Sequence, residues 1–453
     1  MVFQNSNVIF YMSVHLKVKT IVACFIGILG MLTCCKKADE TLTTDPSVKL
    51  AFSHDTIFFD TLYTTVPNIT KRLLVYNHSK NAVKVSHISL EGLSNSPYTL
   101  IINGKKSFSE SNVEIRGKDS IYILISVVLK ATDTTEAYVV SDKILFNTNG
   151  NIQSVALECF AQNANFYVNA QTGCDTTWTA GKPFVIYNSL TIPEGCTLTI
   201  EKGTKVLFHN DATLKVEGTL IVNGEKDREV VFGSDKRGKI YEDQPGQWAG
   251  IYFTSKSKDN TINFSIIENA STGIYQEEVV DTDTVPELIV SNSIIRNMKN
   301  EGFSLSADTY LWNDLTYNTL GSSIAVKGKE TVYIRHSTIS GYSFSYFRDY
   351  PLLDFSRAGG VTRIENSIVW GDRFSEVLTG GDLLFRNCIV KSNQPVAGSG
   401  NIIKAPLFKN PFRLDFHPDS LSPAIDAGLP LEIMMDLDNK NRDAQPDLGA
   451  YEK

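Results

Sequence analysis

The sequence predicts an all-β protein with two β architectures in series: an Ig-like β-sandwich over residues 48–162 and a parallel solenoid over residues 187–410. Three observations support this fold class. Apolar and polar residues alternate in short runs up to residue 162, Gly-separated strands without helical periodicity follow residue 187, and the solenoid region contains an internal repeat. Of the 453 residues, 42% are hydrophobic and 21% charged, which excludes extended disorder, and a net charge of −7 argues against nucleic-acid binding.

The N-terminus has the pattern of a secretory signal. Lys17 and Lys19 precede the apolar run 20–32, which is too short to cross a bilayer comfortably. The following Leu32-Thr-Cys-Cys35 resembles the lipobox of bacterial lipoproteins, which implies that residues 1–34 are removed and Cys35 is acylated, with Cys34 as the alternative. The resemblance places the protein in the outer membrane, either at the cell surface, which we favour, or facing the periplasm. Residues 35–47 would then be the lipidated Cys and a polar tether; a plain cleaved signal is the other interpretation.

Four cysteines follow this leader: Cys159, Cys174, Cys196 and Cys388. An exported protein is free to form disulfides. Cys174 and Cys196 are close enough in sequence to pair, although two buried free thiols are an equal alternative. The chain has no C-x-x-C motif, which argues against a structural zinc site.

The β-sandwich is predicted from four alternating runs, at 56–59, 71–76, 83–88 and 120–127, which are separated by turn-forming residues such as Asn77-His-Ser79. The Cys…Trp…Cys pattern of antibody domains is absent, so the Ig-like assignment concerns architecture alone. We interpret this region as a spacer rather than a ligand-binding domain, followed by a connector at 163–186.

The solenoid opens with Leu190-Thr-Ile-Pro-Glu-Gly195 and Leu198-Thr-Ile-Glu-Lys-Gly203 and reaches Gly246-Gln-Trp-Ala-Gly-Ile-Tyr-Phe253. These phrases resemble the opening coils of right-handed parallel β-helix proteins. The resemblance implies that residues 187–410 form such a β-helix.

Six downstream segments align with one another, most of them with Asn at the third position and most with Ser at the fourth, which predicts one repeat per coil. We align them on the third position and expect this column to face inward as a ladder of amides. His336 belongs to the column, and we interpret it as a structural histidine rather than a base because no carboxylate partner is evident. The column residues are Phe264, Asn292, Asn318, His336, Asn366 and Asn387.

The opposite parity predicts an outward column of aromatic and charged residues. Aromatic rings beside Arg and Glu suit sugar rings and uronate carboxylates, which makes this column a candidate glycan-binding surface; an ordinary solvated face is the alternative. The candidate residues are Tyr317, Tyr333, Arg335, Arg363, Glu365 and Arg386.

The last residues read Ser422-Pro-Ala-Ile-Asp-Ala-Gly428, then Asp436, Asp438 and Arg442, then Asp447-Leu-Gly-Ala-Tyr-Glu452. This phrase resembles the C-terminal module of surface β-helix proteins of the choice-of-anchor Q type, in which it closes the last coil. The resemblance implies that residues 411–453 are a cap.

Two roles are open for the acidic residues of this module. Asp426, Asp447 and Glu452 are predicted to pair with Arg442 and hold the cap in place. Alternatively, Asp436 and Asp438 bind Ca²⁺, although Lys440 occupies the position at which a calcium loop of the EF-hand type has an oxygen ligand. No other cofactor is expected.

These features predict a non-catalytic cell-surface lipoprotein that contacts extracellular glycans or envelope components. The chain has no G-x-S-x-G, H-E-x-x-H or phosphate-loop motif, and the outward column has Glu365 as its one carboxylate. One alternative is a polysaccharide lyase or glycoside hydrolase that acts on acidic polysaccharide. Another is a purely structural or adhesion component of the envelope. The sequence does not predict the oligomeric state.

Overall fold

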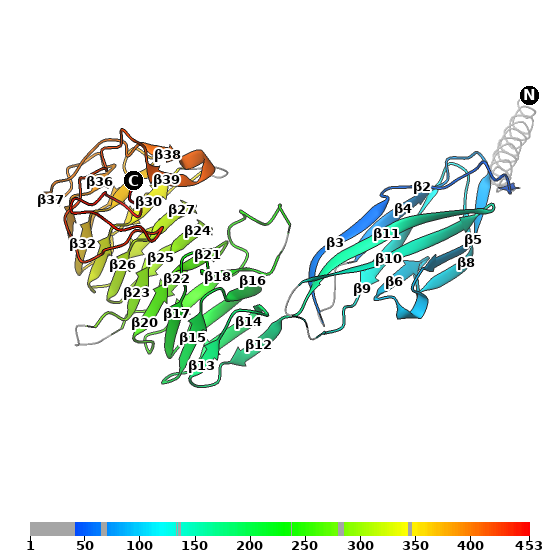
Figure 1. Cartoon of the computed structure of the whole chain (residues 1–453), viewed down its shortest axis with the longest axis horizontal. Coiled ribbons are helices and arrows are strands. Elements are labelled where there is room, and N and C mark those ends of the chain that lie inside the picture. The colour runs from blue at the N-terminus through cyan, green and yellow to red at the C-terminus, as the bar shows by residue number, and fades with distance from the viewer. Residues whose placement is uncertain are drawn as a thin grey trace, which may run out of the picture. The chain divides into compact units, whose positions relative to one another are not determined.

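The computed structural model describes residues 41–453 except 65–69, 133, 135–136, 237, 280–284 and 343–346. The regular structure of these residues is β-strands and two short 3-10 helices, so the described chain is all-β (Figure 1). Within it, no helix has the length and hydropathy to cross a membrane. The predicted signal peptide and lipidated cysteine, Cys35 or Cys34, lie outside the described residues.

The chain divides into two compact units. The first contains the residues up to 58 together with 67–127 and 141–158, and the second contains residues 59–66, 128–140 and 159–453. The first unit contains two sheets with mainly antiparallel pairing, and Phe52 of one sheet contacts Phe146 of the other at 4.8 Å between ring centroids. One sheet contains β1 (Leu42–Thr43), β5 (Ala82–Leu90), β10 (Tyr138–Thr148), β11 (Asn151–Gln162), β3 (Thr56–Tyr63) and β8 (Ser109–Ile115). The other contains β2 (Ala51–Phe52), β4 (Lys71–Tyr76), β9 (Ser120–Val127), β6 (Tyr98–Ile102) and β7 (Lys105–Ser107), and the 3-10 helix η1 (Leu93–Asn95) precedes β6.

The second unit is built from large parallel sheets, consistent with a parallel β-helix. Each full coil contributes one strand to each of three faces, which we name in chain order the first, second and third face. The first face is a ten-stranded sheet of β13 (Thr176–Trp178), β15 (Thr197–Glu201), β17 (Thr219–Asn223), β20 (Asn260–Asn263), β23 (Leu288–Ser291), β26 (Thr309–Trp312), β29 (Val332–Arg335), β32 (Val361–Glu365), β35 (Asp382–Arg386) and β37 (Gly398–Ser399).

The other two faces join through the long strand β16 (Lys205–Val216), which pairs with the first strand of each. The second face contains β18 (Val230–Ser234), β21 (Ser265–Glu268), β24 (Ile294–Met298), β27 (Leu315–Thr319), β30 (Thr338–Gly341), β33 (Ile368–Gly371) and β36 (Ile389–Val390). The third face contains β19 (Gly250–Phe253), β22 (Ile274–Gln276), β25 (Phe303–Leu305), β28 (Ile324–Val326), β31 (Leu353–Asp354) and β34 (Val377–Leu378).

The parallel sheets begin earlier than the sequence predicted. Residues 163–186, expected to be a connector, include β12 (Asn165–Gln171), β13 and the start of β14 (Phe184–Ile192). β12 pairs in parallel with β14, and β13 with β15, so this segment already belongs to the stacked coils.

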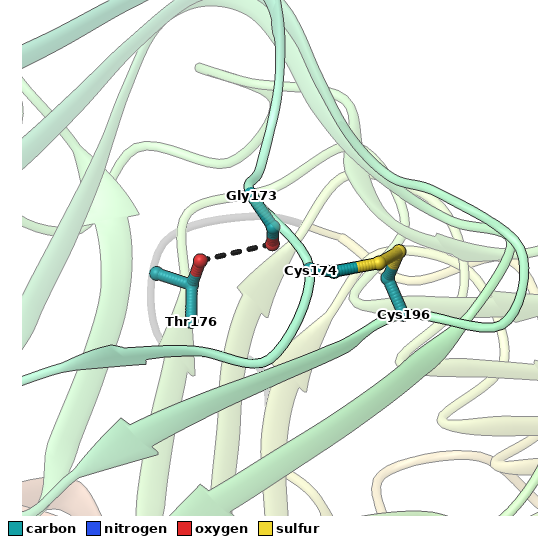
Figure 2. The surroundings of a disulfide bond; sticks show 4 residues. All are labelled: Gly173, Cys174, Thr176 and Cys196. Atoms are coloured by element: carbon teal, nitrogen blue, oxygen red, sulfur yellow. Dashed lines mark hydrogen bonds between the residues drawn. A yellow bond between two sulfur atoms is a disulfide. The ribbon is translucent and has the colours of Figure 1, made fainter.

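A disulfide between Cys174 and Cys196 decides the open question about these two cysteines (Figure 2). It links the turn before β13 to the turn before β15, with the two Cα atoms 4.5 Å apart. Beside it, the Thr176 hydroxyl donates a hydrogen bond to the Gly173 carbonyl at 2.9 Å. Cys159 and Cys388 are free and buried.

The predicted Asn column lies at a corner of the coil rather than on an inward strand position. Between the first and second faces, every coil from β20 to β35 turns through a residue with φ between 46° and 58°, a conformation that Asn tolerates better than most residues. In the third of these coils the turn residue is Asn313, not Asn318 as aligned from the sequence. Asn318 occupies the next corner, where its amide donates to Asn297, which in turn donates to Asn269.

The C-terminal module, which the sequence predicts as a cap, contacts the outer side of the second face. It begins with β38 (Phe408–Asn410), the 3-10 helix η2 (Pro411–Arg413) and β39 (Asp415–Pro418). Together with residues 419–453 it packs along the outer side of the second face, and we name residues 408–453 the C-terminal segment. One apolar cluster joins Leu315, Tyr317, Ile368 and Ile389 of the second face to Phe408, Phe416, Ala424, Leu437, Leu448, Ala450 and Tyr451.

Candidate functional site

Strand alternation on the first face places a group of aromatic and charged side chains on its outer side. In β26, β29, β32 and β35 the inward residues Leu311, Ile334, Ile364 and Phe385 are completely or almost completely buried. The residues between them point outward and form two adjacent columns in register. One column contains Tyr310, Tyr333 and Arg363; the other contains Trp312, Arg335, Glu365 and Arg386. We name these seven residues the Trp312 surface.

The aromatic part of the Trp312 surface is compact and partly exposed. The Tyr310 ring meets the Tyr333 ring edge-on at 5.0 Å between centroids and lies 6.2 Å from Trp312. The Arg335 guanidinium stands 5.4 Å from the centroid of Tyr333, within the range of a cation–π interaction. Because Tyr310 and Tyr333 are nearly perpendicular, the edge of one ring meets the face of the other, and the two rings are not stacked face to face.

The charged part centres on Glu365, whose side chain is 8% exposed. Its Oε2 accepts from Arg335 Nε at 2.9 Å, and its Oε1 accepts from Arg386 Nη1 at 2.8 Å. In the neighbouring column, Arg363 Nη2 donates to the exposed Asp382 at 2.6 Å, and this hydrogen bond lowers the pKa of Asp382. Three arginines face two carboxylates, so this group carries one excess positive charge.

Five of the six predicted glycan-binding residues therefore lie together, and Tyr317 does not join them. Tyr317 belongs to β27 of the second face and is 4% exposed. Its hydroxyl accepts from Arg296 at 2.9 Å, and its ring lies 5.3 Å from Phe416 of the C-terminal segment. The expectation that Tyr317 lies on an open face is wrong because the C-terminal segment covers it.

Trp312 and Tyr310 are the aromatic residues that sequence reasoning missed. In its outward column, Trp312 lies in register between Ser291 and Arg335. The alignment of the sequence repeats had assigned this position to Tyr317. The signal was present in Leu311-Trp-Asn-Asp314, which has the same apolar-x-Asn arrangement as the other rungs.

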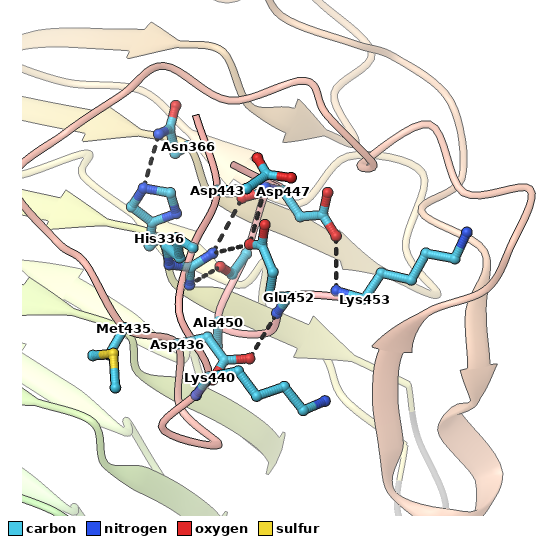
Figure 3. A network of polar contacts seen from close by, with 12 residues as sticks. His336, Asn366, Met435, Asp436, Lys440, Asp443, Asp447, Ala450, Glu452 and Lys453 are labelled. Atoms are coloured by element: carbon cyan, nitrogen blue, oxygen red, sulfur yellow. Dashed lines mark hydrogen bonds and ion pairs between the residues drawn. The ribbon is translucent and has the colours of Figure 1, made fainter. Parts of the chain in front are cut away.

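Three of the predicted cap residues, Arg442, Asp447 and Glu452, lie in one buried network of the C-terminal segment (Figure 3), whereas Asp426 is exposed and joins it through its backbone N–H. Arg442 Nη1 donates to Glu452 Oε2 at 3.0 Å, and its Nη2 donates to the Gly449 carbonyl and to Asn313 Oδ1. Asp447 accepts from the backbone N–H of Asp426 at 2.8 Å. Burial lowers the pKa of Arg442 and raises that of Glu452, since both charges have left water. The network therefore fixes the C-terminal segment to the corner of the coil at Asn313.

The two predicted calcium ligands have separate partners. Asp436 is fully buried and accepts from the backbone N–H groups of Lys440 and Glu452. Asp438 binds Lys226 at 2.9 Å and His417 at 2.8 Å. In the described part of the chain, no three His, Cys, Asp or Glu side chains are grouped so that they could hold a metal ion. The geometry thus gives Asp436 and Asp438 structural contacts rather than a shared ligand set.

Comparison with known proteins gives no family: no family model matches, and no curated protein matches. Three of the similar solved structures are the PapD-like domain 7 of human CEP192, the E. coli chaperone DraB and a family 123 glycoside hydrolase from Clostridium perfringens. They are 12%, 10% and 6% identical, cover 29%, 26% and 28% of this chain, and have TM-scores of 0.19, 0.18 and 0.19. The alignments span 94%, 56% and 30% of those chains. Likeness at this level supports no statement about function.

Proposed function

We propose that this protein is a non-catalytic surface lipoprotein that binds extracellular glycans through the Trp312 surface. In this proposal Cys35, or Cys34, carries the lipid at the outer membrane. An Ig-like β-sandwich serves as the spacer, and the parallel sheets form a right-handed β-helix. The observation that carries the proposal is the partly exposed group of Tyr310, Trp312 and Tyr333 beside Arg335.

The chemistry of these side chains favours a saccharide. An indole or phenol ring packs against the C–H groups of a pyranose, and planar guanidinium groups donate paired hydrogen bonds to sugar oxygens or carboxylates. The side chains stand on neighbouring strands of one sheet, so little conformational entropy is lost when a ligand orders them.

The electrostatics of the surface favour binding over hydrolysis. A glycosidase of the usual kind needs one carboxylic acid that stays protonated to act on the leaving group. Here Glu365 lies between two guanidinium groups, and the hydrogen bond from Arg363 lowers the pKa of Asp382, which favours its ionised form. Asp382 is therefore poorly suited to donate a proton, and both oxygens of Glu365 already accept hydrogen bonds from arginines.

Affinity electrophoresis through gels that contain different plant, host and microbial polysaccharides tests this proposal. We expect retardation on at least one glycan, with the glycan size unchanged. Trp312→Ala should weaken binding by roughly 3- to 10-fold, the loss of about 0.5–1.5 kcal/mol of aromatic contact. Tyr122→Ala, which removes a 57% exposed aromatic ring of the first unit, is the matched control and should bind like the wild type.

Two other outcomes would redirect the assignment. Shortened or unsaturated glycan would make the protein a hydrolase or lyase. Absence of retardation on every glycan would leave a structural or adhesion role in the envelope.

A further inference from the structure

A second candidate binding site lies on the outer side of the second face, and no residue of the C-terminal segment is among its lining residues. It is a pocket of about 370 Å³ between the loop that follows β18 and the strands β21 and β24. Ser234, Gly238 and Asn269 line it together with the charged and aromatic side chains of Lys236, Tyr241, Glu242, Asp243, Glu268 and Arg296.

The loop that forms one wall is held in place by buried amides. Gln247, which is 6% exposed, donates from Nε2 to the carbonyls of Tyr241 and Gln244 at 2.6 and 2.9 Å. Asn269 donates to the carbonyl of Glu242 at 3.0 Å and accepts from Asn297 at 2.9 Å. Asn269 belongs to the row of hydrogen-bonded amides at the corner between the second and third faces, so the wall is anchored to the coils. The pocket therefore exists before any ligand binds.

The opposite side of the pocket is a fixed ion pair. Arg296 Nε and Nη2 both donate to Glu268 Oε2, at 2.9 and 2.5 Å, so Glu268 Oε1 is not needed for this pair. Arg296 Nη1 donates to the Tyr317 hydroxyl at 2.9 Å. Tyr317 follows Arg296 in register and is buried under the C-terminal segment, so a polymer cannot continue along this column beyond Arg296.

The lining presents donors and acceptors at close intervals. Lys236 and Arg296 are donors, while Glu242, Asp243 and Glu268 are acceptors. The Lys236 ammonium lies 5.8 Å from the centroid of the Tyr241 ring. Among the described lining residues, three carboxylates stand beside two cations, and this polar lining disfavours a hydrophobic ligand. A group of adjacent hydroxyls, each both donor and acceptor, matches this arrangement.

We propose that this pocket is a second saccharide site, which binds a mono- or disaccharide unit at the end of a glycan, separately from the Trp312 surface. The choice of ligand class rests on the proposed function, whereas the site itself rests on the pocket and its fixed walls.

Saturation-transfer NMR and calorimetry with free mono- and disaccharides (neutral hexoses, N-acetylhexosamines and uronates) test it on the purified protein. We expect at least one of these sugars to bind and Trp312→Ala to leave its affinity unchanged. Tyr241→Ala, which keeps the backbone carbonyl that Gln247 needs, and the isosteric Asp243→Asn should each weaken binding at least tenfold. Unchanged thermal unfolding would show that both variants are folded.

The outcomes separate the two proposals. If no free sugar binds while polysaccharide retardation persists, the pocket proposal is overturned and the proposed function stands. If a free sugar binds but Trp312→Ala abolishes it and Tyr241→Ala does not, its site is the Trp312 surface and the pocket proposal is again overturned. If pocket variants alone lose binding and no polysaccharide is retarded, the pocket proposal stands and the role of the Trp312 surface falls.

Discussion

Asn366 donates a hydrogen bond from Nδ2 to His336 Nε2 at 2.9 Å, at the corner between the first and second faces. The backbone of Leu429 fixes the orientation of this amide, since its carbonyl accepts from Nδ2 and its N–H donates to Oδ1. His336 Nε2 therefore accepts a hydrogen bond and carries no proton, so the ring is neutral in the folded protein. The structural interpretation of His336 agrees with this geometry.

Acid should destabilise the protein through His336. Burial, and then the positive charge of Arg442, lower the pKa of its imidazole from 6.5 to about 2. Below about pH 6.5 the unfolded chain binds a proton that the folded protein excludes, so stability is lost as pH falls from 6.5 toward 2, by about 1.4 kcal/mol per pH unit. We expect His336→Asn, the residue found at most other rungs of this corner, to flatten this part of the curve. Denaturant unfolding between pH 7 and 4 measures it.

The exposed His54 is the control for this experiment. His54→Asn should leave the pH dependence as it is in the wild type. Equal slopes for His336→Asn and the wild type would contradict the assignment.

Loss of Arg442 should be among the most destabilising single substitutions. Its side chain is 2% exposed, and Arg442→Ala would leave Glu452 buried without its cation, a change that costs about 3–5 kcal/mol. The double variant Arg442→Met/Glu452→Gln removes both charges and should recover part of the loss. Thermal unfolding of both variants measures this. The exposed pair Lys256–Glu194 serves as control, because Lys256→Ala should cost no more than about 1 kcal/mol. An equal loss in the two alanine variants would refute the role of Arg442.

The Cys174–Cys196 disulfide closes a loop with a sequence separation of 22 residues at the start of the parallel sheets. A loop of this length predicts a stabilisation of about 3 kcal/mol. The double variant Cys174→Ser/Cys196→Ser should therefore lower the unfolding midpoint of the second unit, and reductant should do the same to the wild type but not to the variant. A linked peptide in a non-reducing digest would confirm the bond. If reductant leaves the wild-type midpoint unchanged, the disulfide does not contribute to stability.

The strands and the repeat were predictable because they depend on local chemistry. Short apolar runs recur from coil to coil, and Asn at positive φ recurs in most coils, and both signals are visible in a single sequence. The same chemistry caused the alignment error: Asn occupies two corners of the coil, so Asn313 and Asn318, five residues apart, both fit the pattern. Choosing Asn318 replaced Trp312 with Tyr317 in the candidate site.

The cover on the second face was only half predictable. Outward positions of this face hold Ile294, Leu315, Ile368 and Ile389, beside inward apolar residues, and a strand that is apolar on both sides must be buried on both sides. That pattern indicates that another part of the protein covers this face, but it does not identify that part. The covering apolar residues lie in the C-terminal segment, and no sequence pattern links them to the strands against which they pack. The pocket beside Tyr241 was unpredictable because the position of its wall depends on long-range hydrogen bonds, such as the one from Asn269 to the Glu242 carbonyl.

Gly449 provides a direct test of how closely the C-terminal segment docks. Its φ of +92° disfavours any side chain, and a Cβ there would lie 2.6 Å from Thr338 Oγ1 and 2.9 Å from Ile368 Cδ1. We expect Gly449→Ala to destabilise the docked segment by about 1–3 kcal/mol and to speed limited proteolysis within residues 419–453. Gly104→Ala separates the two causes, because Gly104 has a similar φ of +80° but a Cβ there would meet no atom within 4 Å. If the two variants lose equal stability, backbone conformation alone accounts for the effect; if Gly449→Ala loses more, the difference measures the contact between the C-terminal segment and the second face.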